Sequence, residues 1–187
     1  PTSVFRAMAS EDPYPVKAFF CLGNNALLSY ANQNQIHEAM LNQELIVSHE
    51  IFMTPTAMLA DYVLPGDVFT ERNHVADSWS WSTRLALSQK VVEPPAEASS
   101  TFQFWTDLAH RMGFADEFPW TNLEDMLDYR LARGGRTFQE FASETYMELA
   151  PPKFCKYRDK GFATPSGKVE LASSILGDLG FDPLPYY

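Results

Sequence analysis

Two short apolar segments separated by a helix-like stretch restrict what the first part of this chain can fold into. Residues 16–22 and residues 45–47 are runs of aliphatic and aromatic side chains, and the first run stops abruptly at Gly23. Short apolar runs closed by turn residues are typical of buried strands. Between them, Asn32 and Gln35 have the spacing of a helix cap and its partner. The pattern predicts a strand–helix–strand unit with parallel strands.

A short helix and further strands are predicted after the second strand. Thr54 followed by a proline is a good helix opening, and we expect a short helix over residues 55–60 and a third strand over residues 62–64. Residues 72–82 read as an irregular polar loop that carries tryptophans, and residues 84–88 as a further strand.

Three later segments begin with the pattern Ser/Thr-x-x-Glu/Gln, which is typical of helix N-termini. The pattern predicts helix N-caps at Ser100, Thr121 and Thr137. The apolar side chains spaced to form the core-facing sides of the first two are Phe102, Trp105, Ala109 and Met112, then Leu123, Leu127 and Leu131. In the tail, residues 153–161 read as a basic loop, residues 162–171 as a turn between short extended pieces, and residues 182–187 as a proline-stiffened linker.

Charge and composition exclude several classes of protein. Lys and Arg number 14 against 24 Asp and Glu, so the formal net charge is −10 and a nucleic-acid partner is not expected. No apolar run approaches the roughly 20 residues that cross a bilayer, so membrane insertion is not expected. The start at Pro1 lacks an initiator Met and a secretory pattern, which indicates an excised segment.

The spacing of the cysteines and histidines indicates no local metal site. Cys21 and Cys155 form no C-x-x-C pair, and no two of the four histidines lie three to five residues apart. Cys21 lies inside an apolar run, where a cysteine acts as a small hydrophobic residue. Asp61 and Glu71 are candidates for acid–base chemistry, but isolated carboxylates of this kind are usually solvated or cap a turn.

The loops that follow the first two strands are the places to look for a ligand. In an open α/β sheet, ligands bind beyond the carboxyl ends of the strands. Gly23, Asn24 and Asn25 follow the first strand, and Glu50 follows the second, where an acidic residue would receive ribose hydroxyls or a guanine edge. Because G-x-G-x-x-G is absent, spacing alone leaves a nucleotide site and a plain structural turn both open. It identifies no reaction.

The amino-acid sequence of these loops resembles that of a known protein family. Residues 16–25, 45–57, 60–65 with Glu71, 164–170 and 182–185 are similar, in that order, to the large catalytic subunit of the dimethyl sulfoxide reductase superfamily of molybdopterin oxidoreductases. Two loop positions depart from the family's usual residues. Asn25 stands where proline is common, and Glu50 stands where aspartate is common.

The resemblance implies a fragment of a larger enzyme. Members hold molybdenum or tungsten between two molybdopterin guanine dinucleotides and move two electrons, often with an oxygen atom. Residues 1–181 would be part of one dinucleotide-binding domain, and residues 182–187 a linker to a further domain. We therefore expect an α/β, Rossmann-like open sheet, mainly parallel, with flanking helices and a helical C-terminal insertion.

The resemblance also implies site residues and partners. Gly23, Asn24 and Asn25 would face the phosphate or ribose, Glu50 the nucleoside, and Thr54 and Thr56 the neighbouring loop. No catalytic residue or metal ligand falls within the chain. The remaining domains of the same polypeptide and an iron–sulfur electron-transfer subunit would be partners, and the fragment alone would be inactive.

Two other readings compete with this one. The first is a non-catalytic scaffold or subunit-contact module of the same fold, with Trp79 and Trp81 at a protein interface. The second is an unrelated flavodoxin-like protein that binds a small nucleotide.

Overall fold

The computed structural model describes residues 2–77, 84–144, 146–151 and 153–184. The chain divides into two compact units, Pro1–Met147 and Glu148–Tyr187, and each is described by itself. Among the described helices, none has the length and apolar content needed to cross a membrane. Trp79 and Trp81 fall outside the described residues, as does the end of the expected linker.

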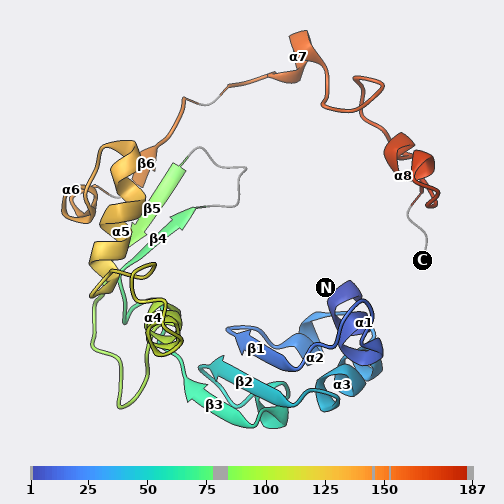
Figure 1. The fold of residues 1–187 in the computed structure, drawn as a ribbon. Helices are drawn as coiled ribbons and strands as arrows, with labels where there is room; N and C mark the ends of the chain where they lie inside the picture. The colour runs from blue at the N-terminus through green and yellow to red at the C-terminus, as the bar shows by residue number, and fades with distance from the viewer. Residues whose placement is uncertain (1, 78–83, 145, 152, 185–187) are drawn as a thin grey trace. The chain divides into compact units, whose positions relative to one another are not determined.

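The predicted strand–helix–strand unit is confirmed in the first sheet. Its strands are β1 (Ala18–Leu22), β2 (Leu45–Glu50) and β3 (Tyr62–Pro65), in the order β1-β2-β3 (Figure 1). Both pairings are parallel, so the carboxyl ends of all three strands lie at one edge of the sheet.

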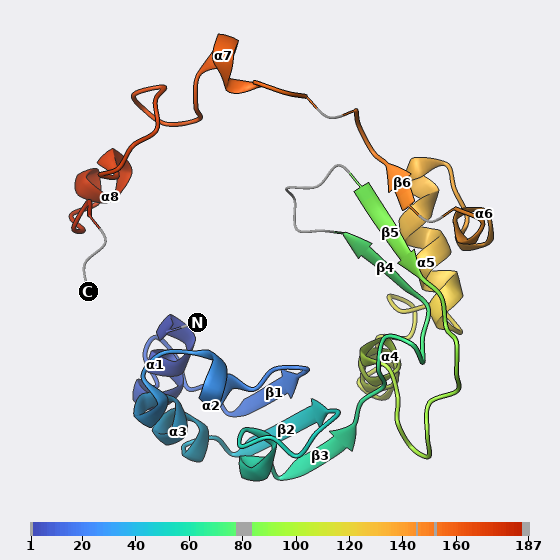
Figure 2. The same ribbon diagram turned by 180° about the vertical axis from the view of Figure 1, so that it is seen from behind.

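Helices cover one face of this sheet. They are α1 (Thr2–Ser10), α2 (Ala26–Ser29) and α3 (Gln33–Leu41), and Figures 1 and 2 both place them beside it. The predicted cap of α3 is confirmed, since Asn32 accepts a 3.5 Å hydrogen bond from the Gln35 amide. The core they form with the sheet consists of Phe5, Met8, Cys21, Ala26, Ile36, Ala39, Met40 and Ile46.

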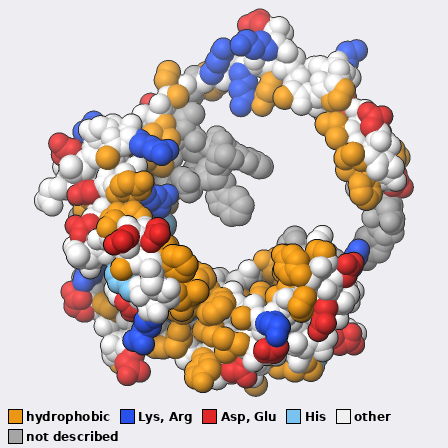
Figure 3. All heavy atoms as spheres, viewed as in Figure 1, with side chains coloured by type: hydrophobic (Ala, Val, Ile, Leu, Met, Phe, Trp, Pro, Cys, Tyr) orange, Lys and Arg blue, Asp and Glu red, His pale blue; other side chains and the backbone are white. Residues whose placement is uncertain are grey.

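The opposite face is covered by α4 (Thr101–Arg111), which starts at the predicted cap Ser100. The ring of Phe104 lies 6.0 Å from Phe20 and 6.1 Å from His49. Hydrophobic side chains gather at the surface where α4 meets the first sheet (Figure 3).

The predicted core face of α4 was partly wrong. Ala109 is buried, but Trp105 is 42% and Met112 63% exposed, while Thr106 is buried. Met112 is the C-cap, so it lies beyond the last turn that packs on the protein. The ring of Trp105 contacts Phe20 on one side and is open on the other.

A second sheet contains β4 (His74–Asp77), β5 (Arg84–Ser88) and β6 (Tyr146–Glu148), in that order. Strand β4 corrects the prediction of an irregular loop over residues 72–82. The expectation of a mainly parallel open sheet is confirmed for the first sheet only, because β4 and β5 of the second sheet pair antiparallel. Residues 78–83 between them are too few for the crossover that parallel strands require.

The core of the second sheet is built with α5 (Leu123–Leu131), η2 (Ala132–Gly134) and α6 (Phe138–Ala142). Its buried members are Val75, Leu127, Leu131 and Phe141. The predicted capping box of Thr137 with Glu140 is confirmed. The cap predicted at Thr121 was wrong by one residue, because Asn122 accepts from the Asp125 amide while Thr121 donates to the Asp125 carboxylate.

The short helix predicted over residues 55–60 is a single 3₁₀ turn, η1 (Ala57–Leu59). The predicted capping role of Thr54 is confirmed, since its hydroxyl accepts a 3.2 Å hydrogen bond from the Ala57 amide.

The second unit contains α7 (Tyr157–Lys160) and α8 (Ser174–Asp178). Helix α7 corrects the prediction of a loop over residues 153–161. The turn predicted over residues 162–171 is confirmed, although no strand flanks it in the described part of this unit.

Candidate functional site

The carboxyl edge of the first sheet brings together the residues that follow β1 and β2. Leu22 is the register partner of His49, and the Gly23 amide donates a 2.9 Å hydrogen bond to the His49 carbonyl. Glu50 is the next residue of β2, so Gly23 and Glu50 end neighbouring strands at one edge. This arrangement follows from the parallel pairing that the sequence pattern predicted.

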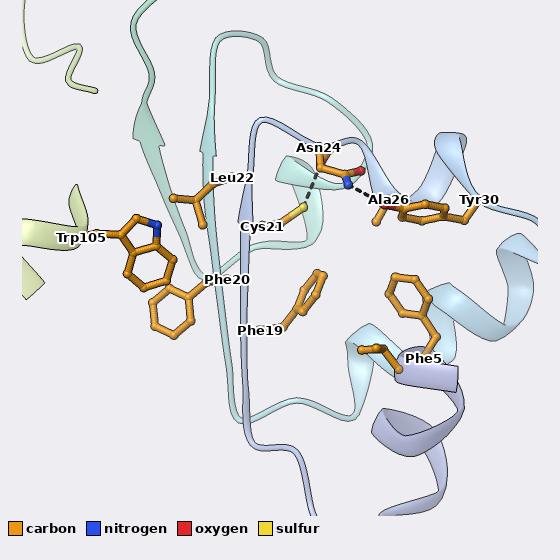
Figure 4. Close-up of a pocket in the computed structure, with 10 residues that line it drawn as sticks. Phe5, Phe19, Phe20, Cys21, Leu22, Asn24, Ala26, Tyr30 and Trp105 are labelled. Carbon is orange, nitrogen blue, oxygen red and sulfur yellow. Dashed lines mark hydrogen bonds between the residues drawn. The ribbon is translucent and has the colours of Figure 1, made fainter. Parts of the chain in front are cut away.

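The loop after β1 is shaped by Gly23 and Asn24. Gly23 is exposed with φ +60°, a backbone conformation that glycine adopts without strain. The Asn24 side-chain amide donates a 2.8 Å hydrogen bond to the Tyr30 hydroxyl, and the backbone carbonyl of Asn24 accepts a 2.8 Å hydrogen bond from the Cys21 thiol (Figure 4). Asn24 Oδ1 is buried and has no hydrogen-bond partner among the described residues. Buried side-chain polar atoms normally have a partner, either protein or ordered water, so this oxygen can accept from a group that the protein does not supply.

Asn25, Thr54 and Thr56 hold the loops rather than project from them. The Thr56 hydroxyl donates to Asn25 Oδ1 at 2.8 Å and accepts from the Leu27 amide at 3.0 Å. Thr56 is 0% exposed, so solvent does not reach it. The Thr54 hydroxyl accepts a hydrogen bond from the Ala57 amide. These three predicted site residues therefore lie beside Gly23 and Asn24 with their polar groups engaged within the protein.

Glu50 lies partly exposed at the end of β2. One carboxylate oxygen accepts a 2.9 Å hydrogen bond from the following amide, that of Ile51. Burial raises the pKa of the Cys21 thiol, and the negative charge of Glu50 adds to that rise. Cys21 therefore stays protonated, which agrees with the prediction of a small hydrophobic residue.

The loop after Glu50 carries exposed apolar side chains. Ile51, Phe52 and Met53 are 49%, 75% and 65% exposed in succession. Three consecutive exposed apolar residues beside a candidate site are typical of a surface that contacts another molecule or another part of a polypeptide.

Asp61 and Glu71, the candidate acid–base carboxylates, bind backbone amides. Asp61 accepts from the Ile46 amide at 2.7 Å, and Glu71 accepts from the Val68 amide at 2.9 Å. Asp61 thus ties the segment before β3 to β2, and Glu71 caps a local turn, so both carboxylates have structural partners. The described residues contain no group of three or more His, Cys, Asp or Glu side chains that would hold a metal ion.

Sequence reasoning missed His49. Its ring is 4% exposed, and Nε2 lies 2.9 Å from the Ser99 carbonyl, so the imidazole ties β2 to the segment that leads into α4. The local sequence around His49 did not indicate this role, because the residue that its ring contacts is 50 positions away in the sequence.

Comparison with known proteins gives consistent matches. The signature of the molybdopterin oxidoreductase family matches residues 2–111. Acetylene hydratase of Syntrophotalea acetylenica is 49% identical over 188 aligned residues, which cover 100% of this chain and 26% of that protein. The thiosulfate reductase molybdopterin-containing subunit of Salmonella typhimurium is 25% identical over 95% of this chain and 27% of its own length.

A solved structure gives the same match. Acetylene hydratase from Pelobacter acetylenicus superposes with a TM-score of 0.82 at 47% identity, over 100% of this chain and 26% of that structure. The chain thus spans about a quarter of the length of the curated relatives it matches.

Proposed function

The chain belongs to the molybdopterin oxidoreductase family, and on this premise we propose that it forms part of the domain that binds a molybdopterin guanine dinucleotide in a larger molybdenum or tungsten enzyme. The observation that carries the proposal is the meeting of Gly23, Asn24 and Glu50 at the carboxyl edge of a parallel sheet. This is where α/β folds bind nucleotides. Family membership excludes the unrelated flavodoxin-like reading.

The residues at this edge suit a nucleotide. A Cβ built on Gly23 would have no atom within 4 Å, so a phosphate or sugar can approach the backbone there. The unpaired Oδ1 of Asn24 would accept from a hydroxyl or amino group. The carboxylate of Glu50, with one oxygen outside its bond to the Ile51 amide, would accept from ribose hydroxyls or a guanine edge.

Asn25, Thr54 and Thr56 belong to the proposed site in a different way. Their hydrogen bonds fix the two loops, so they would position Gly23 and Asn24. A bound molybdenum or tungsten centre would supply the redox chemistry of the complete enzyme. Other domains of the same polypeptide, and an electron-transfer subunit with iron–sulfur clusters, would complete it.

The test uses the full-length polypeptide, that is, this segment with the flanking sequence of its gene. After purification, metal analysis should find molybdenum or tungsten, and acid treatment should release guanine nucleotide in stoichiometric amount. Asn24→Ala should lower the nucleotide content, while Asn42→Ala at the exposed C-cap of α3 should not. A full-length protein that carries no metal and no nucleotide would support the scaffold reading instead.

A second candidate activity is the addition of water to a carbon–carbon triple bond. It is favoured by the 49% identity to acetylene hydratase, against 25% to the thiosulfate reductase subunit. Hydration of acetylene gives acetaldehyde with no net electron transfer, so an assay can distinguish hydration from oxidoreduction. Acetaldehyde formed without reduction of an electron acceptor would select hydration, and reduction of an added dye by substrate would select oxidoreduction.

A further inference from the structure

Helices α4 and α5 and the loop that joins them form an apolar pocket, which we call the interhelical pocket. Its volume is about 530 Å³, within the range of about 300–1,000 Å³ that is typical of small-molecule sites. Its apolar lining consists of Phe102 and Trp105 of α4, Phe118 and Trp120 of the loop, and Met126 and Tyr129 of α5. The described residues that line it include none of those proposed to hold or position the dinucleotide.

Aromatic rings that contact one another build one wall of the interhelical pocket. The ring centroid of Trp120 lies 6.0 Å from that of Phe118 and 5.3 Å from that of Tyr129. The loop is tied to α4, since Nε2 of His110 lies 2.8 Å from the Phe118 carbonyl oxygen. The wall is therefore formed before any ligand binds, as is usual for small-molecule sites.

The lining contains one buried polar group without a partner. Thr106 is 5% exposed, and its hydroxyl has no hydrogen-bond partner among the described residues. Buried polar atoms normally have one. Rotation about χ1 exchanges the hydroxyl and methyl groups, and threonine in a helix populates two χ1 rotamers. A polar group on a bound molecule would therefore give the Thr106 hydroxyl a partner.

The same lining restricts the charge of a ligand. Among the described residues that line the pocket, Arg130 is the one charged side chain, and it is exposed. A cation would meet the charge of Arg130 without a carboxylate to balance it. An anion would leave water for an apolar surface, which is costly, while solvent screens its attraction to Arg130. These costs favour a neutral ligand.

We propose that the interhelical pocket binds a neutral aromatic molecule of about two rings that carries one hydroxyl or carbonyl group. The rings would pack on the aromatic wall, and the polar group would bond to the Thr106 hydroxyl. A dry cavity of about 150 Å³ already holds benzene, so this pocket has room for two rings. The proposal does not depend on the bound dinucleotide.

Binding of three matched probes to the full-length protein tests the ligand class. In equilibrium dialysis, 2-naphthol should bind once per chain and more tightly than naphthalene, which lacks the hydroxyl, or 2-naphthoate, which is charged. Absence of saturable binding would show an adventitious additive only, or a pocket covered by other parts of the protein, and would overturn the proposal. Tighter binding of 2-naphthoate would assign the pocket to anions and overturn it too.

Methyl NMR of the same protein locates the bound probe without any substitution. Binding of 2-naphthol should shift the signal of Met126, which lines the pocket. The signal of Met112, an exposed methionine at the end of α4, should stay in place. Binding that leaves Met126 unchanged would place the probe elsewhere and overturn the proposal.

Thr106→Val tests the hydrogen bond, because valine keeps the shape of threonine and removes the hydroxyl. It should weaken binding of 2-naphthol about 2-fold to 12-fold, the value of one hydrogen bond, and leave binding of naphthalene unchanged. An equal effect on the two probes would show that Thr106 does not contact the ligand's polar group and would overturn its assigned role.

Trp120→Ala tests the aromatic wall. It should weaken binding of both 2-naphthol and naphthalene at least about 10-fold. Phe114→Ala is the matched control, because Phe114 is an exposed aromatic residue of the same loop that does not line the pocket. Circular dichroism establishes that both variants are folded. Equal binding by the two variants would overturn the proposal.

Discussion

The hydroxyl group of Thr56 donates a 2.8 Å hydrogen bond to Oδ1 of Asn25, and this bond joins the loop after β1 to the loop after β2. The same oxygen accepts the Leu27 amide, so one buried hydroxyl satisfies two groups of the first loop. Asn24 lies next to this junction. The position of the unpaired Asn24 acceptor is thus set by a residue 32 positions further along the chain.

Thr56→Val should destabilise the first sheet, because valine has the shape of threonine but leaves Asn25 Oδ1 and the Leu27 amide without a partner. An unsatisfied buried polar group costs about 1–3 kcal/mol. Thr56→Ser, which keeps the hydroxyl, is the matched control. Urea unfolding followed by circular dichroism gives the two free energies of unfolding. Equal stability of the valine and serine variants would show that the hydroxyl does not hold the loops.

Local sequence patterns were sufficient to predict the first sheet. Each of its strands is an apolar run closed by turn residues, and parallel pairing then places Gly23 and Glu50 at one edge. The contact between Asn25 and Thr56 was not predictable, since it joins residues 31 positions apart that come together only in the fold.

The second sheet was harder to predict for a related reason. Strand β4 is four residues long, and Val75 is its one buried hydrophobic residue among those described. Its extended conformation comes from pairing with β5 and packing on α5, which no local pattern encodes. The cap at Asn122 shows the same limit on a smaller scale, because Thr121 and Asn122 compete for one helix start and tertiary geometry decides.

Glu50→Ala in the full-length protein should weaken retention of the dinucleotide. The variant removes a charge-assisted hydrogen bond worth about 1.5–3 kcal/mol, which corresponds to roughly 10-fold to 150-fold weaker binding. Glu44→Ala is the control, because Glu44 lies just before β2 at its other end and forms an exposed ion pair with Lys17. Guanine nucleotide content after dialysis is the measurement. Unchanged content in the Glu50 variant would remove this residue from the site.

The 187-residue chain on its own should fold but not catalyse, because part of a binding domain leaves a dinucleotide exposed and the described residues contain no group of three or more His, Cys, Asp or Glu side chains that would hold a metal ion. Circular dichroism should show helix and strand, and elemental analysis should find neither molybdenum nor tungsten in stoichiometric amount. Turnover of a sulfoxide, an oxyanion or acetylene by the purified chain with bound metal would contradict this expectation.

The carboxylate of Glu170 should make the turn of the second unit sensitive to acid. Hydrogen bonds from Ser166 and Ser174 lower the pKa of Glu170 from 4.5 to about 2. A carboxylate with a lowered pKa stabilises the folded turn above pH 4.5, and this stabilisation is lost as the pH falls from 4.5 toward 2. NMR titration of the Glu170 carboxyl carbon gives the pKa, and Glu170→Gln should abolish the pH dependence of the Ser174 amide. A Glu170 that titrates near 4.5 would show that these bonds do not form.

The closure of the same turn depends on the absence of a side chain at Gly161. Its φ is +66°, and a Cβ built there would lie 2.6 Å from the Gly167 carbonyl oxygen, which accepts the Phe162 amide at 2.9 Å. Gly180 also has a positive φ, +81°, but a Cβ there would have no atom within 4 Å.

Alanine at either position must adopt a positive φ, and at Gly161 it must also adopt a ψ of −165°, a region that is essentially limited to glycine. Gly161→Ala therefore combines this backbone cost with the clash, whereas Gly180→Ala tests a positive φ without a clash. Gly161→Ala must displace the Gly167 carbonyl and break its bond to Phe162, and the stacking of Phe162 on Tyr157, at 4.5 Å between ring centroids, should be lost with it. Hydrogen exchange at the Phe162 amide should therefore accelerate in Gly161→Ala and stay unchanged in Gly180→Ala. Equal exchange in the two variants would mean that the carbonyl yields to the new methyl group at little cost and that the turn is held by the Glu170 carboxylate rather than by Gly161.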